Sequence, residues 1–152
     1  MCGTSIGEVL RAGAGAGASR RPPHTPCFVA GSRIATAGGP VAIEELRTGD
    51  RVLTRDNGYP PIRWIGGRAF DAAALADFPE LRPVRMARGA LGADVPSADL
   101  MVSPQHRVLL SGAHAAGHGE DSEILAAAAD VVSLGLAAVE EARSVVYYHI
   151  MF

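Results

Sequence analysis

Residues 27–68, CFVAGSRIATAGGPVAIEELRTGDRVLTRDNGYPPIRWIGGR, decide the fold class of this chain. Short apolar runs alternate here with turn-forming groups such as Gly38-Gly39-Pro40 and Thr48-Gly49-Asp50. Runs of this length, bounded by glycine and proline, are typical of short strands. Asp56-Asn57-Gly58 adds a hairpin signal, because asparagine and glycine tolerate the positive φ angles of tight hairpin turns. The stretch therefore predicts a mainly β fold.

The same alternation continues to the end of the chain. We predict a β-fold of many short strands with minor helix. The strands are expected at Arg33–Thr36, Asp50–Thr54, Ile62–Ile65, Leu81–Met86, Leu100–Val102, Arg107–Leu110 and Val145–Phe152. Short helices are expected at Ile43–Leu46, Ala72–Phe78 and Glu123–Ala129.

The N-terminal region has a different composition. Residues 11–24 alternate alanine and glycine and end in a basic, proline-rich stretch, which offers too little apolar surface to offset the entropy of ordering. We predict a flexible Ala/Gly/Pro-rich segment over residues 1–26 and one domain over 27–152, which is long enough to bury a core unaided. The two cysteines, Cys2 and Cys27, fall on either side of this boundary, so no structural disulfide is expected.

Charge and hydropathy exclude several function classes. The net charge is −2, and the 14 basic residues, all arginine, are scattered among 16 acidic ones, which argues against a nucleic-acid partner. No apolar run approaches the roughly 20 residues of a transmembrane helix. The N-terminus lacks the basic and apolar regions of a secretory signal, which leaves export by a non-classical bacterial route open.

Cys27 directly follows Pro26 at the start of the predicted domain. One interpretation is a small buried apolar residue, the usual environment of a free cysteine. The other is a nucleophile directed at its own preceding peptide bond. The residues around this cysteine and farther along the chain bear on the choice.

Three further stretches follow Cys27 in a characteristic order: IEELRTGDRVLT at residues 43–54, SPQH at 103–106 and VVYYHIMF at 145–152. With this cysteine they resemble the Hint module of Hedgehog proteins and inteins, in its bacterial form. The resemblance implies a Hint-type β-fold and a self-processing reaction. In that reaction the thiolate of Cys27 attacks the carbonyl of Pro26 and turns the amide into a thioester.

The resemblance also implies roles for individual residues. His106 protonates the departing amide nitrogen, for which an imidazole is suited because its pKa lies near neutral pH. Ser103 stands where the family has threonine and retains an orienting hydroxyl. His149 falls near a later acid/base position of the family, with a cross-strand surface histidine as the alternative. No cofactor and no metal are implied.

The implied reaction is a single turnover. Its substrate is the chain's own N-terminal segment, and water, a thiol or another nucleophile accepts the acyl group. The sequence ends at Phe152 without the terminal His-Asn pair with which inteins release a downstream peptide. We therefore expect cleavage of the Pro26–Cys27 bond without splicing, a domain lacking its last segment, and an exposed edge on the final strand.

Two hypotheses from other classes stay open. One is a non-catalytic Hint-like β-scaffold that serves as an attachment or interaction module of a larger exported protein. The other, weaker hypothesis is a cysteine hydrolase acting on other molecules, for which the sequence offers no dedicated oxyanion loop.

The remaining conspicuous residues have structural interpretations. His114 and His118 would share a helix face and suggest a metal, but neighbouring glycines argue against a helix, so solvated loop histidines are expected. Trp64 is expected to anchor the core beside its hairpin. Asp50 is expected to cap backbone amides at a strand entrance.

Overall fold

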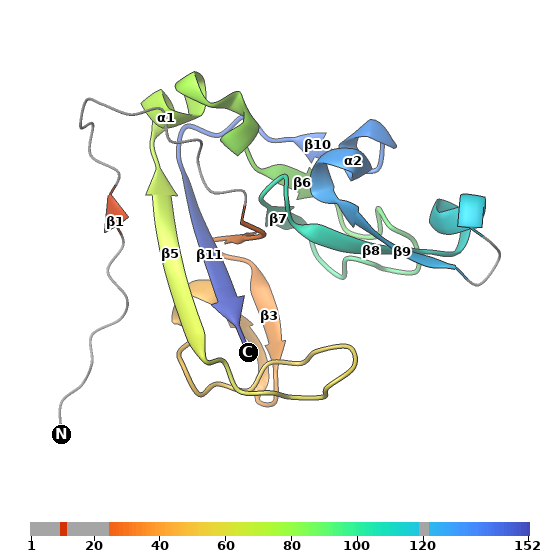
Figure 1. Ribbon diagram of the computed structural model, residues 1–152, viewed down its shortest axis with the longest axis horizontal. Helices are drawn as coiled ribbons and strands as arrows, with labels where there is room; N and C mark the ends of the chain where they lie inside the picture. Colours follow the sequence, from red (N-terminus) through yellow and green to blue (C-terminus); the bar gives the residue numbers. More distant parts are fainter. Residues whose placement is uncertain (1–9, 12–24, 119–121) are drawn as a thin grey trace.

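The computed structural model describes residues 10–11, 25–118 and 122–152 (Figure 1). The strands are β1 (Leu10–Arg11), β2 (Phe28–Val29), β3 (Arg33–Thr36), β4 (Gly39–Ala42), β5 (Trp64–Phe70), β6 (Val84–Met86), β7 (Leu100–Val102), β8 (Arg107–Ser111), β9 (Glu123–Ala127), β10 (Ala138–Val139) and β11 (Val145–Met151). Helical elements are α1 (Ala72–Asp77), α2 (Ala128–Ser133) and the short 3₁₀ helices η1 (Ile43–Glu45), η2 (Pro79–Leu81) and η3 (Gly112–His118).

The fold is centred on one sheet with the strand order β1-β5-β11-β2-β7-β6-β10. Its longest pair is β5 and β11, antiparallel over seven register positions from Val145↔Phe70 to Met151↔Trp64. The short strand β2 lies on the other side of β11, with Tyr147 opposite Val29. The first folded residues after Pro26 therefore enter the middle of the sheet, beside the last strand of the chain.

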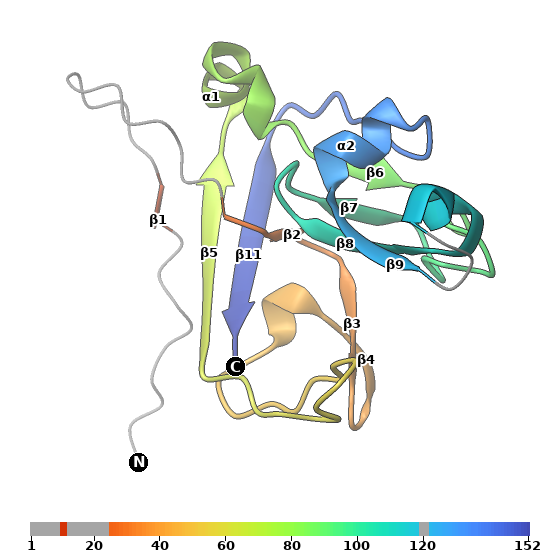
Figure 2. The same ribbon diagram turned by 45° about the vertical axis from the view of Figure 1, so that its right-hand side comes forward.

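Two antiparallel ribbons complete the fold. The β3–β4 ribbon follows β2 directly, and the β8–β9 ribbon pairs Arg107–Ser111 with Glu123–Ala127. Figures 1 and 2 show β8–β9 beside β6 and β7, on the side of the sheet away from β5. The turn that joins β7 to β8 is thereby brought to β2.

Three apolar clusters fill the molecule. The first surrounds Met86, Val102 and Leu110 beneath the β8–β9 ribbon and α2. A second surrounds Ile43, Val52 and Ile62 near the β3–β4 ribbon. The third, which we call the thiol-side cluster, consists of Val29, Phe70, Leu75, Leu81, Val145 and Tyr147. Cys27 packs against this third cluster.

The structure confirms the predicted mainly β class. Strands β3, β7, β8 and β11 and helices η1 and α1 lie within a residue of their predicted ranges. The predicted hairpin turn is present: Thr54 and Gly58 bridge antiparallel, and Gly58 has a φ of +63°. The predicted cap is also present, because the Arg47 N–H donates to Asp50 Oδ2 at 2.8 Å.

Several element predictions were wrong. Glu123–Ala129 is not a helix: Glu123–Ala127 pairs with β8 as β9, and a helix begins only at Ala128. Cross-strand pairing here outweighs the helix propensity of alanine. The range Asp50–Thr54 forms isolated β-bridges rather than a strand. Residues 62–65 and 81–86 become strand only from Trp64 and Val84 onward.

The final strand was also misjudged. We expected Val145–Phe152 to present an exposed edge, but β11 lies inside the sheet, between β5 and β2. Within the predicted flexible segment, Leu10–Arg11 pairs parallel with β5 as β1, and Thr25 and Pro26 are described. The rest of that segment lies outside the described residues. Within the described ranges, no helix has the length and apolar character needed to cross a membrane.

Candidate active site

The turn Ser103–His106 connects β7 to β8 and docks onto the backbone at Cys27. The Ser103 N–H donates to the Cys27 carbonyl at 2.9 Å, and the His106 N–H donates to the Ser103 carbonyl at 3.0 Å. The His106 carbonyl in turn accepts from the Ala128 N–H at 2.9 Å. Residues far apart in sequence are thus fixed around one peptide segment.

The hydroxyl of Ser103 forms hydrogen bonds with the backbone on both sides of Pro26. Its Oγ accepts from the Cys27 N–H at 2.9 Å and donates to the Thr25 carbonyl at 3.1 Å. Ser103 is buried, with 6% of its surface exposed, so these bonds are shielded from water. A side chain that holds both neighbours of Pro26 fixes the plane of the Pro26–Cys27 peptide bond.

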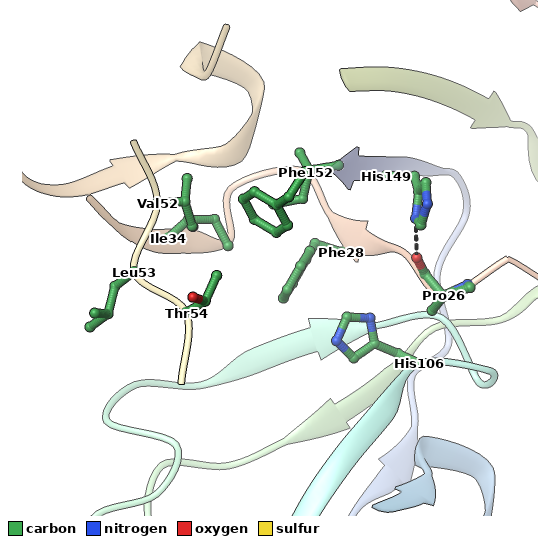
Figure 3. Close-up of a pocket in the computed structure, with 10 residues that line it drawn as sticks. Pro26, Phe28, Ile34, Val52, Leu53, Thr54, His106, His149 and Phe152 are labelled. Atoms are coloured by element: carbon green, nitrogen blue, oxygen red, sulfur yellow. Dashed lines mark hydrogen bonds between the residues drawn. The ribbon is translucent and has the colours of Figure 1, made fainter. Parts of the chain in front are cut away.

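His149 contacts the carbonyl of the same peptide bond. It lies on β11, and its Nδ1 is 2.7 Å from the Pro26 oxygen (Figure 3). A carbonyl oxygen only accepts hydrogen bonds, so Nδ1 carries the proton in this contact. A donor at this distance would stabilise negative charge that develops on the Pro26 oxygen.

His106 lies close to the backbone of Cys27. Its ring packs edge-on against Phe28, with the ring centroids 4.4 Å apart. Burial lowers the pKa of His106, the interaction with the Cys27 backbone partly offsets this shift, and the nearby His149 lowers the pKa further. Within the described part of the chain, its buried Nδ1 has no hydrogen-bond partner. Near neutral pH the His106 side chain is therefore mainly the neutral imidazole, with Nδ1 buried in an apolar environment.

The thiol of Cys27 faces the other way. Cys27 packs against the thiol-side cluster, whereas the next residue, Phe28, packs against His106. Successive side chains of an extended segment point to opposite faces, so the thiol and the His106 imidazole lie on opposite sides of the backbone. Burial raises the pKa of Cys27 to about 11, which keeps the thiol protonated near neutral pH.

A pocket of about 280 Å³ lies on the histidine side of this segment. We call it the histidine-side pocket; it is lined by Pro26, Phe28, Ile34, Val52, Leu53, Thr54, His106, His149, Ile150 and Phe152. Figure 3 shows Pro26 between His149, which reaches its oxygen, and His106. Cys27 does not line the pocket, consistent with the opposite direction of its thiol.

The structure thus brings together Cys27, Ser103, His106 and His149, all named from the sequence. Cys27 and His106 meet through the Cys27 backbone and not through their side chains, because alternation along the segment sends the thiol to the other face.

Two structural expectations about other residues also failed. Trp64 is 47% exposed and lies over Gly66 instead of in the core. The stretch Gly112–His118 is a 3₁₀ helix instead of a loop. Among the described side chains, no group of three or more His, Cys, Asp or Glu residues is arranged to hold a metal ion.

Comparison with known proteins identifies the class of module that this geometry belongs to. The family model of the Hint domain matches residues 26–152, and the chain belongs to this family, a class of self-processing modules. Among solved structures, the chain is similar to a GSH-linked, splice-inactive variant of the AceL NrdHF class 3 split intein. The identity is 14%, the TM-score is 0.47, and the match covers 83% of this chain and 85% of that chain. No curated protein matches the chain.

Proposed function

We propose that the chain cleaves its own Pro26–Cys27 bond through a thioester. The observation that carries this proposal is the contact of 2.7 Å between His149 Nδ1 and the Pro26 oxygen, on a peptide bond whose nitrogen is held by Ser103. A peptide bond polarised at its oxygen and fixed at its nitrogen, with a thiol on the next residue, has the groups that an acyl shift requires.

The reaction proceeds in two steps. The Cys27 sulfur attacks the Pro26 carbonyl carbon, the C–N bond breaks, and the proton lost by the thiol is balanced by one gained at the Cys27 nitrogen. Water, a thiol or another nucleophile then takes the acyl group from sulfur and restores the thiol. Each chain reacts once, and the substrate is its own N-terminal segment.

Each polar side chain has a defined task in this scheme. His149 donates to the oxygen as it becomes negative. His106, next to the Cys27 backbone, supplies the proton to the departing nitrogen, and its lowered pKa makes the imidazolium a stronger acid. Ser103 acts as a positioning residue by holding the peptide plane through Thr25 and Cys27.

One observation favours a second function, a non-catalytic scaffold. The Cys27 thiol is half-buried among apolar side chains and has a pKa of about 11, so only a small fraction is thiolate at neutral pH. A cysteine retained only for packing would have these properties. The two functions differ in whether the chain ever forms an acyl–sulfur bond at Cys27.

Trapping with a strong nucleophile separates the two. The purified chain is incubated with hydroxylamine or a small thiol, and the products are measured by mass spectrometry. We expect a cut between Pro26 and Cys27, its loss in Cys27→Ala, and no change in the matched control Cys2→Ala. Hydroxylamine also attacks Asn-Gly bonds, so the cut at Asn57-Gly58 must be distinguished by mass; the thiol arm does not produce it. A chain that stays intact with both reagents supports the scaffold.

A further inference from the structure

Trp64 lies exposed beside the proposed oxyanion donor. It is the only tryptophan of the chain, and 47% of its surface is exposed. Its indole lies across Gly66 of the same strand: a Cβ added to Gly66 would collide with the indole at Cη2 and Cζ2. Any side chain larger than hydrogen at Gly66 would therefore displace the indole.

The register of the sheet puts this glycine next to His149. Gly66 on β5 is directly opposite His149 on β11. With no side chain at Gly66, the indole reaches over this position, and its ring centroid is 6.1 Å from that of His149, with 53° between the ring planes. Tilted aromatic pairs at such distances attract each other. Trp64 thus flanks the imidazole on the side of β5.

We propose that Trp64 is a positioning residue that fixes the His149 imidazole with its Nδ1–H directed at the Pro26 oxygen. The inference rests on the proposed function for its catalytic consequence, but the orientation itself is measurable without any cleavage. The imidazole can rotate about its side-chain torsions, and such a rotation would place a ring carbon or Nε2 where Nδ1 now lies. The indole restricts this rotation from one side, and the hydrogen bond to Pro26 directs the ring from the other.

The tautomer of His149 gives a direct test. Nitrogen NMR of the histidine rings distinguishes Nδ1–H from Nε2–H, and His149→Gln assigns the signal. We expect the Nδ1–H form in the wild-type chain and a mixture of tautomers in Trp64→Ala. Gly66→Ala, which pushes the indole aside without removing it, should behave in the same way. Leu125→Ala is the matched control, because Leu125 is 63% exposed on the distant strand β9.

The spectrum is recorded at a pH where the histidines are neutral, so that protonation of the imidazoles does not mix with the change of tautomer. The groups to be considered are His106 across Pro26, Arg68 diagonally opposite His149 on β5 with its guanidinium over Phe70, and Cys27 beside β2. His106→Gln shows whether the His149 signal depends on its partner histidine. An unchanged Nδ1–H signal in both Trp64→Ala and Gly66→Ala would overturn the proposal.

Cleavage supplies the second measurement. We expect Trp64→Ala to slow hydroxylamine-dependent cleavage by roughly 10-fold or more, because small displacements of a catalytic group have large effects on rate. Trp64→Phe, which retains an aromatic ring, should restore part of the rate, and Leu125→Ala should match the wild type. If His149→Ala cleaves normally, the role of His149 in the proposed function fails. If only the Trp64 variants cleave normally, the positioning role fails and that function stands.

Discussion

The two sides of the segment that carries Cys27 differ in chemistry. On one side, the thiol packs against the thiol-side cluster, where Tyr147 donates a buried hydrogen bond to the Leu81 carbonyl at 2.7 Å. On the other side, the His106 imidazole packs against Phe28 beside the Cys27 backbone, while His149, two residues beyond Tyr147 on β11, reaches the Pro26 oxygen. The Cys27 thiol is therefore held by packing, whereas Ser103 and His149 are held by hydrogen bonds to the same segment.

This separation explains why the folded chain is not a preformed thiolate–imidazolium pair. Burial raises the pKa of Cys27 and lowers that of His106, so both groups are neutral around pH 7. Burial raises the pKa of Tyr147, and a thiolate at Cys27 raises it further. In the proposed reaction, the reactive state needs both the Cys27 thiolate and the His106 imidazolium, and each is a minor form at neutral pH.

His106→Ala should have the largest effect, a loss of roughly 100-fold or more in cleavage rate at neutral pH. In the wild type, the rising thiolate fraction and the falling imidazolium fraction compensate, so we expect a flat rate between the lowered pKa of His106 and the Cys27 pKa of about 11. Without His106 the rate should rise about tenfold per pH unit with the thiolate alone. The measurement is the pH profile of cleavage with excess hydroxylamine.

The control for that profile is His106→Gln, which keeps a polar side chain of similar size but cannot donate a proton as an acid. It should follow His106→Ala. A wild-type rate that itself climbs about tenfold per pH unit would show that no acid with the low pKa of His106 takes part.

Ser103→Ala should have a smaller effect, a loss of about 10-fold in cleavage rate. The reacting groups remain, but the hydrogen bonds that fix the peptide plane are lost. Ser103→Thr retains the hydroxyl and should stay within about 2-fold of the wild type. Cleavage rates of the two variants at one pH, compared at equal folded fractions, make the measurement. Equal losses in both variants would point to packing around the turn instead of the hydroxyl.

Much of this arrangement was predictable from local sequence. The Ser103–His106 turn and the cysteine after Pro26 could be named because their residue types occur in a fixed order along the chain. The direction of the Cys27 thiol could not, because it depends on which cluster each side of β2 meets. His149 could be named from its place in the sequence, but its contact with the Pro26 oxygen could not, because that contact depends on the register of β11 in the sheet.

The errors in the secondary structure have the same origin. Glu123–Ala127 is rich in residues that favour helices, yet its partner Arg107–Ser111 makes it a strand. The Trp64 side chain is apolar, which predicted a place in the core. It packs instead over Gly66 of its own strand, where no side chain occupies the space. In each case a residue distant in sequence, or the absence of a side chain, decides the outcome.

Tyr147→Phe tests the thiol side of the comparison. It removes the donor to the buried Leu81 carbonyl, so we expect the free energy of unfolding to fall by about 1–3 kcal/mol. The cleavage rate per folded chain should stay within about 2-fold, because the phenol hydroxyl bonds the Leu81 carbonyl and not the Pro26–Cys27 peptide. Urea unfolding and cleavage are measured on the same sample. A large loss of rate without a loss of stability would mean that the thiol side also supplies chemistry.

The smallest expected effect is on stability in acid, and it belongs to the histidine side. The folded chain lowers the pKa of His106, mainly by burial, from its ordinary value of 6.5. Below that pH the unfolded chain binds a proton more readily than the folded one, so stability falls as pH falls and is unaffected at pH values well above it. We expect the thermal midpoint of the wild type to drop more between neutral and mildly acidic pH than that of His106→Gln. His114→Gln, on η3 away from the site, should follow the wild type. Equal drops in the wild type and in His106→Gln would show that the imidazole of His106 is hydrated in the folded chain, which would remove the physical basis for its lowered pKa.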